Sequence, residues 1–287
     1  MSSNIDEAID LRDGICHFNV LVIGRANAGK TTLLKRVCNS VEDPEIFSPS
    51  GEKASPRGAR RGWHNIENQL IFKSNPQFIF HDSRGFESAS VEEIENVKAF
   101  IAERAASTRL SQQLHTIWYC MPTDTNRPLL EADKQFFNHH AAGQVPVIAI
   151  FTKFDGLVTK AFAELKRGGA TRQEAMTKRI EKALEMLTAN FVEPLSSTAI
   201  RPADWVHLSN MHEDGGSNCN DLIEKTANAL NNDALRLLFV SVQQNNINVC
   251  ISYAVRRYCE GHFGVLSTQL GMFAMLGLCI NDNSPMT

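Results

Sequence analysis

A glycine-containing segment that directly follows an apolar run carries the residue types needed to hold a phosphate group. The segment GRANAGKT, at 24–31, fits the pattern G-x-x-x-x-G-K-[ST]. Glycines let backbone N–H groups surround an anion, and the positive end of the following helix adds to the attraction. In this pattern Lys30 is expected to reach the β- and γ-phosphates of a nucleotide, and the Thr31 hydroxyl to bind Mg²⁺. The predicted phosphate-binding residues are Gly24, Asn27, Ala28, Gly29, Lys30, Thr31 and Thr32.

A second motif, DSRG at 82–85, follows the apolar residues FIF. A carboxylate at Asp82 can hold Mg²⁺ through water, and the N–H of Gly85 can contact the γ-phosphate. Asp and Gly are common in turns, so this spacing alone predicts little. Its place after a strand and after the phosphate-binding segment favours a metal site, with Thr31 and Asp82 as the predicted metal ligands.

Two further motifs could recognise a base. In TKFD, at 152–155, the carboxylate of Asp155 can accept from both the ring N–H and the exocyclic amine of guanine, which adenine cannot satisfy. Lys153 is expected to lie along the purine, beside Thr152. In HLSN, at 207–210, a backbone N–H after Ser209 could meet the guanine carbonyl, with Asn210 next to it. The pair of motifs therefore predicts GTP or GDP rather than ATP as the ligand.

Short apolar runs precede these motifs and read as buried strands. The predicted strands are 18–23, 66–72, 77–82, 117–121, 145–151 and 205–209, with a Ser-Asn-Pro turn making 66–72 and 77–82 an antiparallel hairpin. The predicted helices are 29–38, 90–106, 128–140, 156–167, 171–191 and 220–231. The segment 42–62 is rich in Pro, Ser, Gly and Arg and is predicted to be a loop. Strands alternating with helices indicate an α/β fold with an open, mostly parallel sheet and flanking helices.

Composition limits the classes of function. The 287 residues include 29 Lys and Arg against 32 Asp and Glu, a formal charge of −3, which argues against a nucleic-acid partner. The seven cysteines are scattered without a Cys-x-x-Cys pair, so neither a disulfide framework nor a structural zinc site is expected. The acidic N-terminus lacks the apolar stretch of a secretory signal, and the expected compartment is the cytoplasm.

Taken together, the four motifs resemble the G domain of TRAFAC-class P-loop GTPases over about 18–231. GRANAGKTT is most similar to the phosphate loop of the translation and ribosome-assembly group. The wider segments HNIENQLIF, FIFHDSRGFE and IAIFTKFD are similar to small G-domain proteins of mushroom-forming fungi. The resemblance implies GTP and GDP as ligands, Mg²⁺ as cofactor and hydrolysis of GTP to GDP and phosphate.

The chain departs from that family at positions that matter for hydrolysis. Where Ras-like members have a glutamine that orients the attacking water, this chain has Phe86. No threonine lies between Thr32 and Thr108 to complete the Mg²⁺ shell, and Ser48, Ser50 and Ser55 are the candidates left in the first switch loop. These departures predict a slow GTPase switch. The alternative is a GTP-dependent interaction module that does not hydrolyse its ligand; an ATP-dependent enzyme is opposed by TKFD.

Asn27 and an arginine cluster could compensate for the missing glutamine. In the GTPases that this phosphate loop resembles, an asparagine at the position of Asn27 can bind a monovalent cation, usually K⁺, which makes Asn27 a catalytic candidate beside Lys30. The alternative is an asparagine chosen for a tight turn. Arg57, Arg60 and Arg61 could supply charge to the phosphates, within one chain or across a self-association through the switch loops, or form a solvated basic face. A protein effector would bind at the same loops.

The chain divides into an N-terminal segment at 1–17, a G domain at 18–231 and a helical extension at 232–287. An amphipathic helix is predicted at 233–262 and is expected to pack on the α/β core. The run 263–280 has no charged residue but is interrupted by polar residues and glycines. It is predicted to be a helix buried against the G domain or a partner, with a tail that associates peripherally with an intracellular membrane as the alternative.

Overall fold

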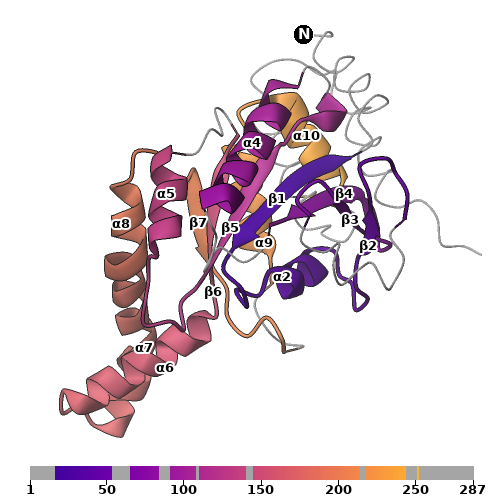
Figure 1. Cartoon of the computed structure of the whole chain (residues 1–287). Coiled ribbons are helices and arrows are strands. Elements are labelled where there is room, and N and C mark those ends of the chain that lie inside the picture. The colour runs from indigo at the N-terminus through magenta and orange to yellow at the C-terminus, as the bar shows by residue number, and fades with distance from the viewer. Residues whose placement is uncertain are drawn as a thin grey trace, which may run out of the picture.

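The computed structural model describes residues 17–53, 65–83, 91–107, 110–139, 145–213, 218–243 and 251. Within this part of the chain, a seven-stranded sheet has the order β2-β3-β4-β1-β5-β6-β7 (Figure 1). Neighbouring strands run parallel from β4 to β7 and antiparallel at the β2–β3–β4 edge. The strands are β1 Phe18–Gly24, β2 Glu45–Phe47, β3 Gln69–Phe72, β4 Asn75–Asp82, β5 Thr116–Pro122, β6 Val147–Thr152 and β7 Asp204–His207. The predicted α/β class with a mostly parallel sheet is confirmed.

Helices pack on both faces of the sheet and create two apolar cores. The helices that contribute to the first core are α2 Lys30–Val37, α9 Asn220–Ala229 and α10 Asp233–Ser241. Those that contribute to the second are α4 Val91–Ala106, α5 Glu131–His139, α6 Phe154–Arg167, α7 Arg172–Leu187 and α8 Glu193–Ser196, with a π-helical turn, Thr188–Val192, between the last two. Strands β1, β5 and β6 are buried over their whole length. Burial on both faces explains why their sequences are almost continuously apolar.

The helix that follows α9 packs on the sheet, as expected for an amphipathic helix in this stretch. The ring of Phe239 in α10 lies 4.7 Å from that of Phe18 and 5.9 Å from that of Phe78. Just beyond α10, the carbonyl of Val242 accepts a hydrogen bond from Asn75 Nδ2 at 3.0 Å. These contacts join α10 to the start of β1 and β4.

Two predictions about the antiparallel edge are wrong in detail. The segment 42–62, predicted to be a loop, contains β2, in which Ile46 is buried and pairs with Leu70 of β3. The turn of the hairpin is formed by Lys73 and Ser74 rather than by Ser-Asn-Pro, because β4 already begins at Asn75. Asn75 pairs with Phe72 across this turn, and its buried side chain is held by the carbonyl of Val242, just beyond α10.

Several predictions fall outside the described residues: the N-terminal segment up to 16, the switch arginines with Ser55, the Gly85–Phe86 pair, the Ser90 helix cap and the tail at 263–280. Of the predicted helix at 233–262, the structure describes α10, the two residues after it and Ile251. None of the helices in the described ranges is both long enough and apolar enough to cross a membrane.

Candidate nucleotide site

The predicted motifs meet at the carboxyl ends of the parallel strands, which is where open α/β sheets bind ligands. A cavity of about 670 Å³ opens there, within the range of about 300–1,000 Å³ typical of small-molecule sites. The predicted site residues that line it are Asn27, Ala28, Gly29, Lys30, Thr31, Thr32, Asp82, Thr152, Lys153 and Asp155. The fold therefore brings three of the four sequence motifs to one hollow.

The backbone of the segment 24–31, named the phosphate loop here for the ligand that its motif predicts, depends on residues that tolerate unusual conformations. Gly24 has a φ of 151°, and a Cβ atom there would lie 2.2 Å from the carbonyl oxygen of Cys120 in β5. Asn27 and Gly29 have φ values of 57° and 79°, in the left-handed region that asparagine and glycine adopt most readily. The turn alone thus accounts for an asparagine at 27. A role of Asn27 in binding K⁺ stays a prediction.

Lys30 and Asp82 face one another across the loop. Lys30 Nζ donates to the carbonyls of Gly24 and Arg25, both at 3.2 Å, and lies 4.0 Å from Asp82 Oδ1. This oxygen of Asp82 is buried and has no hydrogen-bond partner among the described residues. Burial raises the pKa of Asp82 to about 7, although the nearby Lys30 ammonium acts to lower it.

The chemistry of this corner fits Mg²⁺. Magnesium is bound by oxygen atoms, and sites for nucleotide-bound magnesium use one or two carboxylates together with phosphates and water. Asp82 and Thr31 both line the cavity and both carry side-chain oxygens that can bind a metal, and Asp82 Oδ1 accepts no hydrogen bond from the part of the chain that the structure describes. A cation beside Asp82 would favour the ionised carboxylate, which is otherwise penalised by burial.

Asp82 also predicts a pH dependence of the nucleotide-free protein. Its pKa in the folded state is about 7, whereas an aspartate in an unfolded chain titrates near ~3.9. Between about pH 4 and about pH 7 the folded protein keeps a proton that the unfolded chain has released, so the free energy of unfolding falls as the pH rises. The replacement Asp82→Asn, which does not titrate, should remove this decline.

The measurement is urea denaturation of both proteins, without nucleotide or Mg²⁺, across that pH range. The free energy of unfolding of the wild type minus that of Asp82→Asn should decrease steadily from about pH 4 to about pH 7, by about 1.4 kcal/mol for each pKa unit of the shift. All other titrating groups are common to both proteins. A constant difference would show that Asp82 has an ordinary pKa.

The base-side motif, TKFD at 152–155 on the side of the cavity where a base is predicted, is hydrogen-bonded both to the phosphate loop and to the segment after β7. Thr152 Oγ1 donates to the carbonyl of Ala28 in the phosphate loop at 2.8 Å. Asp155 Oδ1 accepts from the backbone N–H of Asn210 at 2.9 Å. Lys153 has a φ of 57°, and its Nζ lies 3.0 Å from Asp124 Oδ2. TKFD therefore links the phosphate loop to the segment after β7, so that a displacement of either segment can be passed to the other.

Several cavity residues were not among the predicted site residues: Ala26 and Ser83, which lie within two of the motifs, and Leu33, Asp124, Gly156, Met211 and His212, which lie outside them. Asp124 follows the end of β5, so the rule that sites lie at strand ends could have found it. Gly156 allows the close approach of Asp124, because a Cβ atom at 156 would lie 2.8 Å from Asp124 Cβ. Met211 and His212 line the cavity in place of Ser209 and Asn210, and their residue types give no signal in the sequence.

A second hollow, of about 690 Å³, lies along α7. Its lining consists of the apolar side chains of Ile180, Leu184 and Ala189, of Thr188 and of three glutamates, Glu181, Glu185 and Glu193, and includes no residue of the predicted motifs. Of these two hollows, the one at the strand ends gathers backbone turns, two lysines and carboxylates from separate elements of the described chain.

No protein-family model matches the sequence, and no characterised protein shows significant similarity to it.

Proposed function

We propose that the protein binds GTP and GDP with Mg²⁺ and hydrolyses GTP slowly to GDP and phosphate, as a P-loop GTPase with a G-domain fold. One observation carries this proposal: the phosphate loop, Asp82 and TKFD line a single cavity although they come from three distant parts of the chain. The parallel sheet with an antiparallel β2–β3 edge agrees with the G-domain fold.

The phosphate half of the cavity is suited to bind and polarise a triphosphate. The loop and the N-terminal end of α2 would surround the phosphates with backbone N–H groups. Lys30 Nζ, which now rests on two loop carbonyls, would move to the β- and γ-phosphates and stabilise the charge that develops during transfer to water. Thr31 and Asp82 would hold Mg²⁺, which would neutralise part of the negative charge of the phosphates.

The base half favours guanine over adenine. Each carboxylate oxygen can accept two hydrogen bonds, so Asp155 Oδ1 can keep the bond from Asn210 while both oxygens also accept from a base. Guanine offers two adjacent donors, whereas adenine would leave the carboxylate facing an acceptor nitrogen. Lys153 and Asp124, which form an ion pair at 3.0 Å, lie at the same end of the cavity.

The direct test is calorimetric titration of the purified full chain with GDP, GTP and ATP in the presence of Mg²⁺, followed by single-turnover hydrolysis of GTP. Binding of GTP and GDP with slow release of phosphate would support the proposal. A lack of GTP binding, or equal affinities for ATP and GTP, would contradict it.

A GTP-dependent interaction module without hydrolysis is the second candidate. It is favoured by Phe86, which has no polar group to orient water, and by the absence of a threonine between Thr32 and Thr108. In this case GTP would shape a docking surface for a protein effector or a second copy. The same experiment separates the two candidates, since the module would bind GTP and leave it intact over many hours.

K⁺ is the proposed second cation and gives a further prediction. If Asn27 binds K⁺ beside the phosphates, the ion would offset the negative charge that develops in the transition state, and hydrolysis in K⁺ should be about 10-fold faster than in Na⁺. The replacement Asn27→Gly keeps the left-handed turn at this position but removes the amide oxygen. It should abolish the difference between K⁺ and Na⁺ in single-turnover assays at equal ionic strength. Equal rates of the wild type in the two salts would assign Asn27 to the turn alone.

A further inference from the structure

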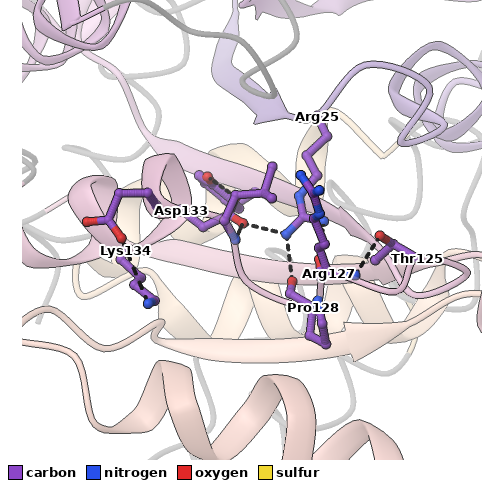
Figure 2. Close-up of polar contacts among 9 residues, drawn as sticks. Arg25, Thr125, Arg127, Pro128, Asp133 and Lys134 are labelled. Atoms are coloured by element: carbon purple, nitrogen blue, oxygen red, sulfur yellow. Dashed lines mark hydrogen bonds and ion pairs between the residues drawn. The ribbon is translucent and has the colours of Figure 1, made fainter.

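The second residue of the phosphate loop, Arg25, is almost completely buried, with 1% of its surface exposed. A buried guanidinium is costly unless its donors are paired. Arg25 Nη1 donates to the carbonyl of Arg127 at 2.7 Å, and Nη2 donates to the carbonyl of Pro128 at 2.6 Å. Nη2 also lies 2.5 Å from Asp133 Oδ2 (Figure 2). All of these partners belong to the segment that leads from β5 into α5.

Asp133 is itself held in place. Its Oδ2 accepts from the backbone N–H of Leu130 at 2.7 Å, and its Oδ1 accepts from the hydroxyl of Tyr119 in β5 at 2.8 Å. The Asp133 side chain is fully buried. The carboxylate that faces Arg25 is therefore fixed both by the strand before this segment and by the residue that directly precedes α5.

The backbone of Arg25 takes part in the phosphate loop while its side chain is clamped. Its carbonyl accepts from the N–H of Ala28 at 3.2 Å, which closes the turn of the loop, and from Lys30 Nζ at 3.2 Å. The orientation of this peptide therefore affects both the loop backbone and the resting place of the lysine. A buried ion pair adds little stability compared with apolar packing. We therefore attribute to Arg25 mainly the positioning of the loop backbone.

The same segment reaches the base half of the cavity. Thr123 Oγ1 donates to the carbonyls of Thr152 and Lys153, and Asp124 pairs with Lys153. The chain from 123 to 133 thus touches the base-side motif at its beginning and Arg25 at its end. One segment therefore contacts both the base-side motif and the phosphate loop.

We propose that Arg25 is a positioning residue for the nucleotide phosphates: clamped by the 127–133 segment, it holds the phosphate loop in the shape that accepts the β-phosphate. The inference rests on the proposed function and deepens it. Loss of the contacts between Arg25 and the 127–133 segment should lower the affinity for nucleotides that carry a β-phosphate. The affinity for nucleotides without a β-phosphate should change little.

The test compares GDP with GMP, because only GDP places a β-phosphate in the loop. Arg25→Lys keeps the charge but loses the planar fork that bonds two carbonyls and a carboxylate. Its affinity for GDP should fall about 10-fold, with the affinity for GMP changed less than about 2-fold. Both are measured by calorimetric titration of the full chain with Mg²⁺.

The control is Thr226→Val in α9, which removes the buried hydrogen bond from Trp118 Nε1 to Thr226 Oγ1 and does not touch the cavity. It should lower the thermal midpoint and leave both affinities unchanged. If Arg25→Lys lowers the midpoint in the same way without changing the ratio of GDP to GMP affinity, Arg25 is only structural and the inference is wrong.

Tyr119→Phe keeps the test decisive if Arg25→Lys does not fold. It preserves the side-chain volume and the Arg25–Asp133 pair and removes one donor to Asp133. We expect a smaller loss, of about 2- to 5-fold, for GDP alone; equal changes for GDP and GMP would overturn the inference. Failure of the wild type to bind GDP would instead contradict the proposed function, so the two failures are distinguishable.

Discussion

Replacement of Lys30 by alanine is expected to lower the affinity for GTP and GDP by about 100-fold or more, because it removes charge-assisted hydrogen bonds to the phosphates. Within the described ranges, the ammonium contacts two loop carbonyls and lies 4.0 Å from Asp82, and these partners stabilise the fold only weakly. Alanine is also well tolerated at the start of a helix. The loss should therefore appear in nucleotide binding rather than in folding. Calorimetric titration with each nucleotide measures it.

Lys35→Ala is the matched control. Lys35 lies in the same helix, but its Nζ pairs with Asp43 at 2.8 Å on the surface and does not line the cavity. Surface pairs of this kind contribute little to stability, so Lys35→Ala should bind GTP as the wild type does. A Lys30→Ala variant that is folded and binds GTP within about threefold of the wild type would contradict the phosphate site.

The second effect of Lys30→Ala concerns Asp82. The lysine lowers the pKa of this carboxyl, which burial raises to about 7. Without the lysine, the neutral form of Asp82 should persist to higher pH, and the pH range over which nucleotide-free protein loses stability should extend upward. This shift can be measured by the same urea denaturation series and does not depend on nucleotide.

The strands that carry the site could be predicted because the strands of a parallel sheet covered on both faces have an almost continuously apolar sequence. The runs at 18–23 and 145–151 are almost entirely apolar, and both are buried strands. Since the motifs begin where these runs end, the sheet edge at which they meet also follows from the sequence. The sequence thus predicted that the segment 24–31, Asp82 and TKFD lie close together, and the structure confirms this proximity, while what they bind stays a prediction.

Features that depend on contacts between distant segments could not be predicted. Ile46 is one buried residue in a segment rich in Pro and Ser, and β2 exists because it pairs with β3. An arginine within the phosphate loop carries no sign of burial, yet its partners lie more than 100 positions further along the chain. Met211 and His212 reach the cavity in a segment that is bonded to distant residues: the backbone N–H of Asn210 donates to Asp155, and Arg36 Nε donates to the carbonyl of Met211.

The bond between Asp155 and Asn210 leads to the last prediction. Replacement of Asp155 by asparagine keeps an oxygen that can accept from the Asn210 N–H, so the segment after β7 should stay in place. The other carboxylate oxygen becomes an NH₂ group, which would face the donor amine of guanine. Loss of a charged acceptor together with this donor–donor contact should reduce the affinity for GTP by about 10²- to 10³-fold.

A change of base should restore binding to the Asp155→Asn variant. Xanthine has a carbonyl where guanine has its amine, and this carbonyl accepts from the new NH₂ group while the ring N–H still donates to the amide oxygen. Titration with XTP should therefore show tighter binding to Asp155→Asn than to the wild type. Asp204→Asn makes the same chemical change at the first residue of β7, which does not line the cavity. It should alter neither affinity. If Asp155→Asn loses GTP without gaining XTP, then Asp155 supports the loop and does not read the base.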